Sequence, residues 1–145
     1  MDIEQLLSSL TLEQKIGQLI IAGFETDSVQ DTHFQKLVND YHVGNVILFT
    51  RNLGEREKTA RFTQGIRDAI VSDCGIPPFV VSDQKGGMVT RIFRAGNVVP
   101  GPMAVGATYN PHNAYRVGRI LGQEMRALGM NFDYAPAVEE ALFRT

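Results

Sequence analysis

This sequence of 145 residues lacks the features of a disulfide-bonded, nucleic-acid-binding or membrane protein. Cys74 is its one cysteine, so no internal disulfide can form, and we expect an ordinary buried or loop thiol. Fourteen basic and sixteen acidic residues give a net charge of -2 without any basic block, which argues against a nucleic-acid partner. The opening MDIEQLLSSL has neither a cationic region nor a long apolar run, so we expect no secretory signal, no membrane span and a cytoplasmic location.

Motifs for phosphate and metal binding are also missing. Neither G-x-G-x-x-G nor a glycine-rich turn ending in Lys-Ser or Lys-Thr occurs, so nucleotide binding has little support. No spacing of ligand residues fits a metal site. His33, His42 and His112 fall inside helical patterns remote from strand ends, where surface or partly buried histidines are expected. We therefore predict neither a cofactor nor a metal.

What remains is an ordinary globular composition, with 43% hydrophobic and 21% charged residues. This length and composition predict one domain, residues 1–145, with a real core. Helix signals begin with T-L-E-Q at 11–14, which fits a capping box. A second helix is indicated by an apolar stripe at helical spacing, made of Phe34, Leu37, Val38 and Tyr41.

Two longer helices follow. One spans roughly Glu55 to Val71. The other begins at Asn110 and Pro111, which suit an N-cap and first helical position, and ends near Gly129. On this last helix we expect three residues to face inward: Val117, Leu121 and Leu128.

Four apolar runs alternate with these helices. They are QLIIAGF (18–24), VGNVILFT (43–50), PPFVVSD (77–83) and MNFDYAPA (130–137). Continuous apolar runs are typical of parallel strands covered on both faces, and alternation with helices predicts an α/β fold of βα units. A small doubly wound sheet and part of a (β/α) barrel both fit. Because a whole barrel of eight units needs about 250 residues, four units are about half of one.

Polar residues follow these strands, and both architectures bind ligands at the carboxyl ends of strands. Asp83 could accept hydrogen bonds from two sugar or polyol hydroxyls, or it could cap the turn at Gly86 and Gly87. Arg91 could grip a carboxylate or ring hydroxyls, or it could face solvent. Arg51 and Asn52 end the second strand and could brace the mouth, meaning the edge of the sheet formed by the carboxyl ends of the strands. A structural salt bridge explains Arg51 equally well.

Two further acids, Glu139 and Glu140, follow the fourth strand. Either could reach a mouth shared with Asp83, and two carboxylates beside a glycosidic bond would suit hydrolysis. Solvated acids at a chain end explain the same two residues.

Taken in order, five segments resemble signatures of glycoside hydrolase family 3, especially its bacterial β-N-acetylglucosaminidases. They are LTLEQKIGQLIIAGF, VGNVILFTRN, SDQKGGMVTRI, VPGPMAVGAT and GQEMRALGMNFDYAPAVE. The resemblance covers nearly all of the chain. It implies four βα units, the first half of a (β/α)8 TIM-type barrel that hydrolyses terminal β-linked N-acetylglucosamine or glucose with retention.

The resemblance also assigns substrate-binding residues. Asp83 resembles the family aspartate that binds sugar hydroxyls, Arg91 an arginine lining the same subsite, and Arg51 with Asn52 the "RN" after the second strand. No catalytic residue is matched, because the family's nucleophile and its acid/base loop lie beyond these segments. We therefore expect a fragment or truncated homologue that is inactive alone. The alternative is a non-catalytic carbohydrate-binding or interaction module that uses the mouth around Asp83 and Arg91.

Three positions depart from the family pattern. Where the family reads Asp-Gln-Glu-Gly-Gly-Arg, Lys85 replaces the glutamate and Met88 the arginine, and Glu139 stands where an aspartate is usual.

A half barrel would also leave its first and fourth strands as open edges beside an apolar inner face, which invites association. We therefore expect a homodimer through these edges.

Overall fold

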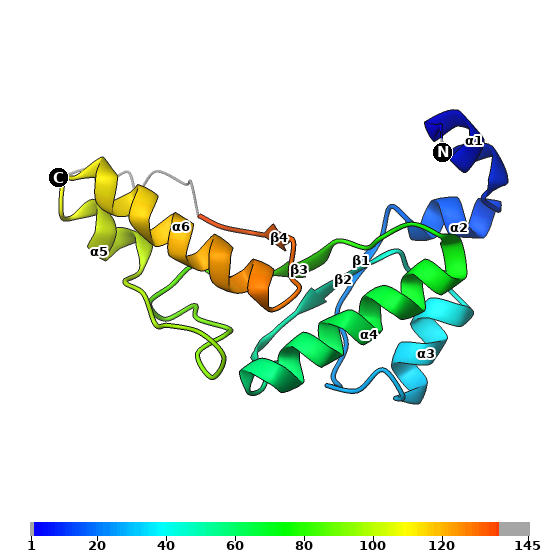
Figure 1. The fold of residues 1–145 in the computed structure, drawn as a ribbon, viewed down its shortest axis with the longest axis horizontal. Helices are drawn as coiled ribbons and strands as arrows, with labels where there is room; N and C mark the ends of the chain where they lie inside the picture. Colours follow the sequence, from blue (N-terminus) through cyan, green and yellow to red (C-terminus); the bar gives the residue numbers. More distant parts are fainter. Residues whose placement is uncertain (1, 137–145) are drawn as a thin grey trace, which may run out of the picture.

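The computed structural model describes residues 2–136 as helices alternating with a small parallel sheet (Figure 1). In chain order the elements are α1 (Ile3–Ser9), α2 (Leu12–Gly17), β1 (Ile21–Ala22), α3 (Thr32–Asn39), β2 (Asn45–Leu48), the 3-10 turn η1 (Thr50–Asn52), α4 (Arg56–Cys74), β3 (Val80–Ser82), α5 (Pro102–Gly106), α6 (Pro111–Ala127) and β4 (Phe132–Asp133). None of the described helices is long and apolar enough to cross a membrane.

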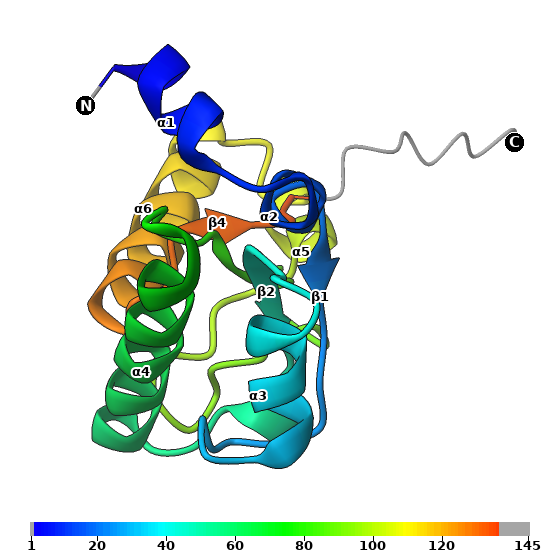
Figure 2. The same ribbon diagram turned by 90° about the vertical axis from the view of Figure 1, so that its right-hand side faces the viewer.

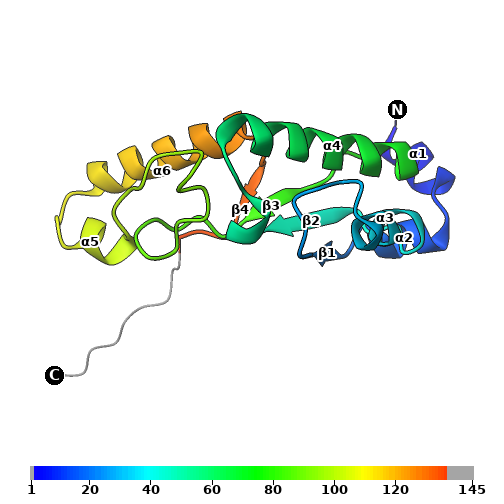
Figure 3. The same cartoon turned by 90° about the horizontal axis from the view of Figure 1, so that it is seen from below.

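The four strands confirm the expected parallel sheet. Their order is β1-β2-β3-β4, every neighbouring pair is parallel, and β1 and β4 remain edges. A doubly wound sheet reverses its strand order at a switch point, whereas a barrel adds its strands in sequence. The observed order therefore fits half of a barrel. Figures 2 and 3 show the sheet from two further directions, with α4 and α6 along the same side of the strands.

Local sequence explains where the helices begin and end. The Thr11 hydroxyl accepts from the Gln14 N–H, and the Gln14 side chain accepts from the Thr11 N–H, which completes the expected capping box of α2. Asn110 caps α6 with Pro111 in its first turn, and Gly129 takes the left-handed φ of 80° just beyond its end. Two short helices, α1 and α5, were not expected; α1 buries no residue and stands apart from the strands (Figure 2).

The core lies between the strands and the helices that cover one face of the sheet. Val46 and Val80 are register partners on β2 and β3, and they belong to the same buried cluster as Phe34 of α3 and Ile66 and Ile70 of α4. Burying a side chain of this size stabilises a fold by about 1.5–3 kcal/mol. The apolar runs of β2 and β3 therefore form the core as predicted. The expectation of burial on both faces is wrong for the edge strands, where Leu19, Ile20 and Phe132 are exposed.

Some of the expected core positions are wrong. Tyr41 is 56% exposed, because α3 ends at Asn39 and the chain turns away before Tyr41. Val117 is only partly buried, whereas Leu121 and Leu128 are buried as expected. His42 lies beyond α3 with a φ of 53°, and its Nδ1 is 2.8 Å from Asp73 Oδ1.

The opposite face of the sheet carries exposed aromatic side chains near its β4 edge. Because side chains alternate along a strand, Phe79 lies opposite the core-facing Val80, and it meets Phe132 edge to face with ring centroids 5.5 Å apart. Phe132 meets Tyr134 in the same way at 5.2 Å. All three aromatic residues are about half exposed. This side of the sheet is therefore an apolar surface, as expected for the inner face of a half barrel.

The burial of Ile66 predicts a large loss of stability in Ile66→Ala. Its side chain is fully buried in the core, so truncation should lower the free energy of unfolding by about 2–5 kcal/mol through lost burial and a residual cavity. Ile3→Ala is the matched control, because Ile3 is exposed on α1 and should change stability by less than about 0.5 kcal/mol. Urea denaturation measures both. Equal losses would contradict the core described above.

Candidate functional site

The carboxylate of Asp83 occupies the mouth of the sheet between two cationic side chains. Asp83 directly follows β3, its Oδ2 lies 3.2 Å from Arg91 Nη2, and its Oδ1 lies 3.0 Å from Lys85 Nζ. The N–H groups of Gly86 and Gly87 donate instead to the carbonyls of Val89 and Val99. Asp83 is therefore an ion-paired acid rather than the cap of the glycine turn.

Electrostatics keep this acid ionised. Partial burial would raise the pKa of Asp83, but the contacts and charges of Lys85 and Arg91 together outweigh desolvation and hold the pKa below its usual value. A carboxylate in this state can only accept hydrogen bonds. Asp83 is thus suited to receive hydroxyl donors and unsuited to give up a proton.

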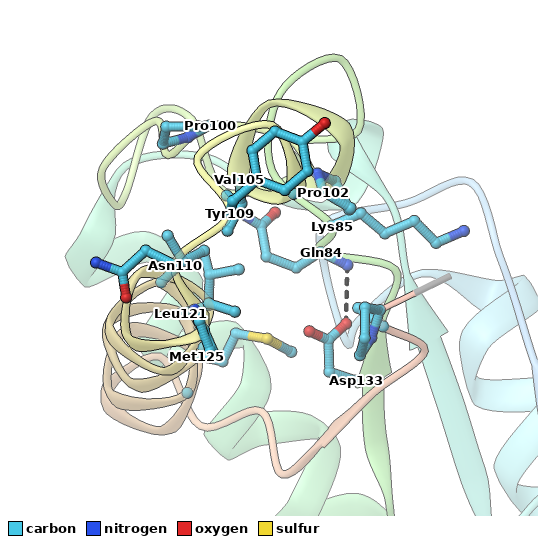
Figure 4. A pocket seen from close by; sticks show the side chains of 18 residues that line it. Gln84, Lys85, Pro100, Pro102, Val105, Tyr109, Asn110, Leu121, Met125 and Asp133 are labelled. Atoms are coloured by element: carbon cyan, nitrogen blue, oxygen red, sulfur yellow. Dashed lines mark hydrogen bonds between the residues drawn. The ribbon is translucent and has the colours of Figure 1, made fainter. Parts of the chain in front are cut away.

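A second acid, Asp133, lies at the end of β4 next to the same loop. Its Oδ1 accepts a 2.8 Å hydrogen bond from the backbone N–H of Gln84 (Figure 4). Desolvation raises the pKa of Asp133, and the charge of Asp83 adds to that rise. Sequence reasoning missed this residue, although an acid within the apolar strand run 130–137 was a visible signal.

Gln84 was also missed, and it positions Arg91. The Gln84 side chain is fully buried, and its Oε1 accepts from the backbone N–H of Arg91 at 2.6 Å and of Ile92 at 3.4 Å. The Arg91 guanidinium lies 5.6 Å from the ring centroid of Phe49, within cation–π range. Within residues 2–136, three buried side-chain atoms of this cluster have no hydrogen-bond partner: Oδ1 of Asp83, Nε2 of Gln84 and Nε of Arg91.

Arg51 and Asn52 hold the neighbouring strand ends together. Asn52 is 1% exposed; its Nδ2 donates to the carbonyls of Phe24 and Thr26, and its Oδ1 accepts from the N–H of Phe49. Arg51 donates from Nε to the Phe24 carbonyl, and the same atom lies 2.9 Å from a carboxylate oxygen of Glu25. The structural salt bridge considered for Arg51 is thus present.

The turn after Asp83 requires its two glycines. Gly86 and Gly87 have φ values of 81° and 57°, and a Cβ on Gly86 would lie 2.7 Å from the carbonyl oxygen of Pro100. The N–H groups of Lys85 and Gly86 both donate to the Val89 carbonyl, which closes the turn. Met88, at the tip of the turn, is fully exposed. Of the two departures from the family pattern in this turn, it is therefore Lys85 that contacts Asp83.

Beside this cluster lies a cavity of about 650 Å³. Figure 4 shows Gln84, Lys85 and Asp133 on one wall of it, with apolar residues of α5 and α6, such as Val105 and Leu121, on the other. Its polar wall faces the carboxyl ends of β3 and β4. The described residues include no group of three or more His, Cys, Asp or Glu side chains that could hold a metal. Glu139 and Glu140 lie outside the described residues.

The two aspartates should titrate in opposite directions from the ordinary value. Because the folded pKa of Asp83 is lowered, its ion pairs stabilise the fold above the unfolded value of about 3.9, and this contribution is lost as the pH falls through the lowered pKa. The raised pKa of Asp133 has the opposite sign: its ionisation costs stability at neutral pH, and acidification through that pKa removes the cost.

A carboxyl-carbon NMR titration should therefore give Asp133 a higher midpoint than Asp83. In Lys85→Gln the midpoint of Asp83 should rise, because one of its two cations is lost. Lys36→Gln is the control, since Lys36 lies on α3 over the ring of Tyr41 and should leave Asp83 unchanged. A midpoint of Asp83 that is unaffected by Lys85→Gln would refute the arrangement.

Comparison with known proteins places this geometry in context. A family model described as the glycosyl hydrolase family 3 N terminal domain matches residues 11–141. Beta-hexosaminidase A of Pseudoalteromonas piscicida is 33% identical over 109 residues, which are 72% of this chain and 18% of that protein.

Solved structures agree. A glycoside hydrolase family 3 beta-N-acetylglucosaminidase from Paenibacillus sp. str. FPU-7 matches with a TM-score of 0.84 and 41% identity, over 88% of this chain and 24% of that one. Beta-N-acetylhexosaminidase from Beutenbergia cavernae DSM 12333 gives 0.78 and 29%, over 88% and 38%. The chain thus spans 18% to 38% of the length of these three relatives. Their likeness confirms four βα units of a TIM-type barrel in an open sheet.

Proposed function

Since this chain belongs to glycoside hydrolase family 3, we propose that its strand mouth is the sugar-binding part of a barrel that hydrolyses terminal β-linked N-acetylglucosamine or glucose with retention. The observation that carries the proposal is the ionised Asp83 carboxylate at the carboxyl end of β3. An ionised carboxylate can accept hydrogen bonds from sugar hydroxyls in addition to its two ion pairs. The names of the relatives, beta-hexosaminidase and beta-N-acetylglucosaminidase, support this class of sugar.

Each of the four predicted binding residues has a separate role in this proposal. Asp83 accepts from the sugar, and Arg91 orients Asp83 and donates to the ligand. Arg51 and Asn52 act through the backbone, because they join the loops that follow β1 and β2. Asn52 thus supports the mouth without facing the ligand.

We propose that residues 1–145 form one unit that binds sugar without hydrolysing it. Retaining hydrolysis requires a nucleophile and an acid/base about 5–5.5 Å apart. In the part of the chain that the structure describes, Asp83 is an ionised carboxylate paired with two cations, and Asp133 accepts a hydrogen bond from the backbone N–H of Gln84. A non-catalytic carbohydrate-binding module is therefore the second candidate function, after the sugar-binding part of a hydrolytic barrel. A cytoplasmic location stays a prediction of the sequence.

Asp83→Ala should abolish sugar binding, and neither the variant nor the unmodified chain should hydrolyse a glycoside. In the unmodified chain, N-acetylglucosamine should produce concentration-dependent amide chemical-shift changes at residues 82–91, and these should vanish in the variant because the acceptor is lost. Asp40→Ala is the control; Asp40 caps the end of α3, away from the mouth. An aryl β-N-acetylglucosaminide should release no chromophore. Release of chromophore by the pure chain would overturn the non-catalytic assignment.

We also propose that two copies associate through the open edges and the aromatic inner face. The support is structural: among residues 2–136, β1 and β4 are the edges of the sheet, and Phe79, Phe132 and Tyr134 form a half-exposed apolar surface beside β4. Two sets of four strands would supply the eight strands of a closed barrel.

Light scattering after size-exclusion chromatography should give twice the 16.0 kDa mass of one chain. Tyr134→Lys should shift the population towards monomer, because the new ammonium would have to be desolvated in the interface. Tyr115→Lys, an exposed position on α6, should leave the mass unchanged. A monomer at all concentrations would refute the dimer.

A further inference from the structure

The Lys85 side chain lies over an acceptor atom that the proposed function needs. Its Nζ is 3.0 Å from Asp83 Oδ1, and only 30% of the side chain is exposed, against 56% for Lys58 in its surface ion pair with Asp27. Its backbone is fixed as well, because the Lys85 N–H donates to the Val89 carbonyl. Lys85 is therefore folded inward onto Asp83.

Asp83 Oδ1 is closed off from solvent. The side chain of Asp83 is 20% exposed, but its Oδ1 is buried and has no aligned hydrogen-bond donor among residues 2–136. A ligand that arrives from solvent therefore reaches at most Oδ2, which already lies 3.2 Å from Arg91 Nη2. Accepting from two sugar hydroxyls, one at each oxygen, requires that Oδ1 is uncovered.

The contact between Lys85 and Asp83 Oδ1 is of a kind that a hydroxyl can replace. It is an ion pair at a partly exposed site, and such pairs contribute little to stability. It also leaves Oδ1 without an aligned hydrogen bond, which is unfavourable for a buried acceptor. A sugar hydroxyl that donates to the carboxylate forms a charge-assisted hydrogen bond instead. The exchange is thus possible, but the ion pair that it breaks lowers the net affinity for sugar.

A second acid lies close to the displaced ammonium. Lys85 and Asp133 line the same cavity of about 650 Å³ (Figure 4), and the charge of Lys85 already opposes the burial that raises the pKa of Asp133. The Gln84 N–H donates to Oδ1 of Asp133, which leaves the other carboxylate oxygen for another donor. Together with Asp83 and Arg91 the cluster holds two acids and two cations. Lys85 can therefore move from one acid towards the other without changing the charge balance.

We infer that Lys85 is a built-in competitor of the sugar: it covers Asp83 Oδ1 in the empty mouth and moves towards Asp133 when a sugar hydroxyl takes its place. The inference rests on the proposed sugar-binding function and adds a control on the affinity of the same site. Lys85 stands where the family pattern has a glutamate, and a glutamate could not pair with Asp83. The departure thus weakens sugar binding at this mouth without removing the binding aspartate.

Calorimetric titration of the full chain with N-acetylglucosamine tests this role. Lys85→Gln should bind the sugar roughly threefold to fivefold more tightly than the unmodified chain, because no ion pair has to be broken. Lys85→Arg, which keeps a cation beside Asp83, should bind no more tightly than the unmodified chain. Lys36→Gln, which removes a positive charge on α3 away from the mouth, should leave the affinity unchanged.

A carboxyl-carbon NMR titration follows the movement of the ammonium. Saturating N-acetylglucosamine should lower the midpoint of Asp133 in the unmodified chain, because the charge of Lys85 comes closer to it. In Lys85→Gln the sugar should not lower this midpoint. The comparison separates an ammonium that moves from a side chain whose loss merely loosens the turn.

Each contrary result has a separate meaning. Equal or weaker sugar binding by Lys85→Gln overturns the inference while the proposed function stands, since the sugar then binds without displacing Lys85. An Asp133 midpoint that the sugar lowers equally in both proteins, or in neither, overturns it as well. Failure of both the unmodified chain and Lys85→Gln to bind N-acetylglucosamine overturns the proposed function, and the inference with it.

Discussion

The mouth of this half barrel depends on the carboxylate of Asp83 and its two cationic neighbours. Asp83 leaves β3 where the strand meets the glycine turn, and its contacts to Lys85 and Arg91 tie both ends of the segment 83–91 together. Gln84, next to Asp83 in the chain, fixes the backbone of Arg91 by accepting a hydrogen bond from its N–H. An ion-paired acid and a buried amide thus position the loop jointly, one from each face of the sheet.

The rest of the mouth is built on backbone contacts that depend on the same strand ends. Asn52 links the loops after β1 and β2, and the N–H of Gln84 links β3 to Asp133 on β4. Side chains that are at least partly buried therefore connect the end of β1 with that of β2, and the end of β3 with that of β4. A rigid binding site requires that the residues supporting the ligand contacts are fixed by contacts of their own, and this arrangement meets that requirement.

Sequence reasoning predicted the fold well because the fold depends on patterns that lie close together in the chain. The capping box at Thr11 and the apolar runs around Val46 and Val80 each carry their meaning within a few residues. The predicted burial of Tyr41 was wrong: its spacing fits the apolar stripe of the helix that contains Phe34, but that helix ends at Asn39, before Tyr41. The α1 and α5 helices were missed since neither contributes a fully buried residue to the core.

The site was predicted less completely, for a physical reason. Asp83 and Arg91 could be found because they end a strand and match a motif, but their partners depend on contacts across the sheet. Asp133 reaches the loop of Gln84 from 49 residues away, and only the β3 to β4 register brings them together. The reach of Lys85 back to Asp83 depends on the two left-handed glycines that follow it.

A double-mutant cycle on Asp83 and Lys85 tests the central claim most directly. The free energies of unfolding of Asp83→Asn, Lys85→Gln and the double variant are compared with that of the unmodified chain at pH 7. If the carboxylate and the ammonium are coupled as described, the cycle should give an interaction free energy of about 1 kcal/mol, at the upper end for a partly exposed pair. Losses that add within about 0.3 kcal/mol would contradict the account, because Lys85 would then not contact Asp83 in solution.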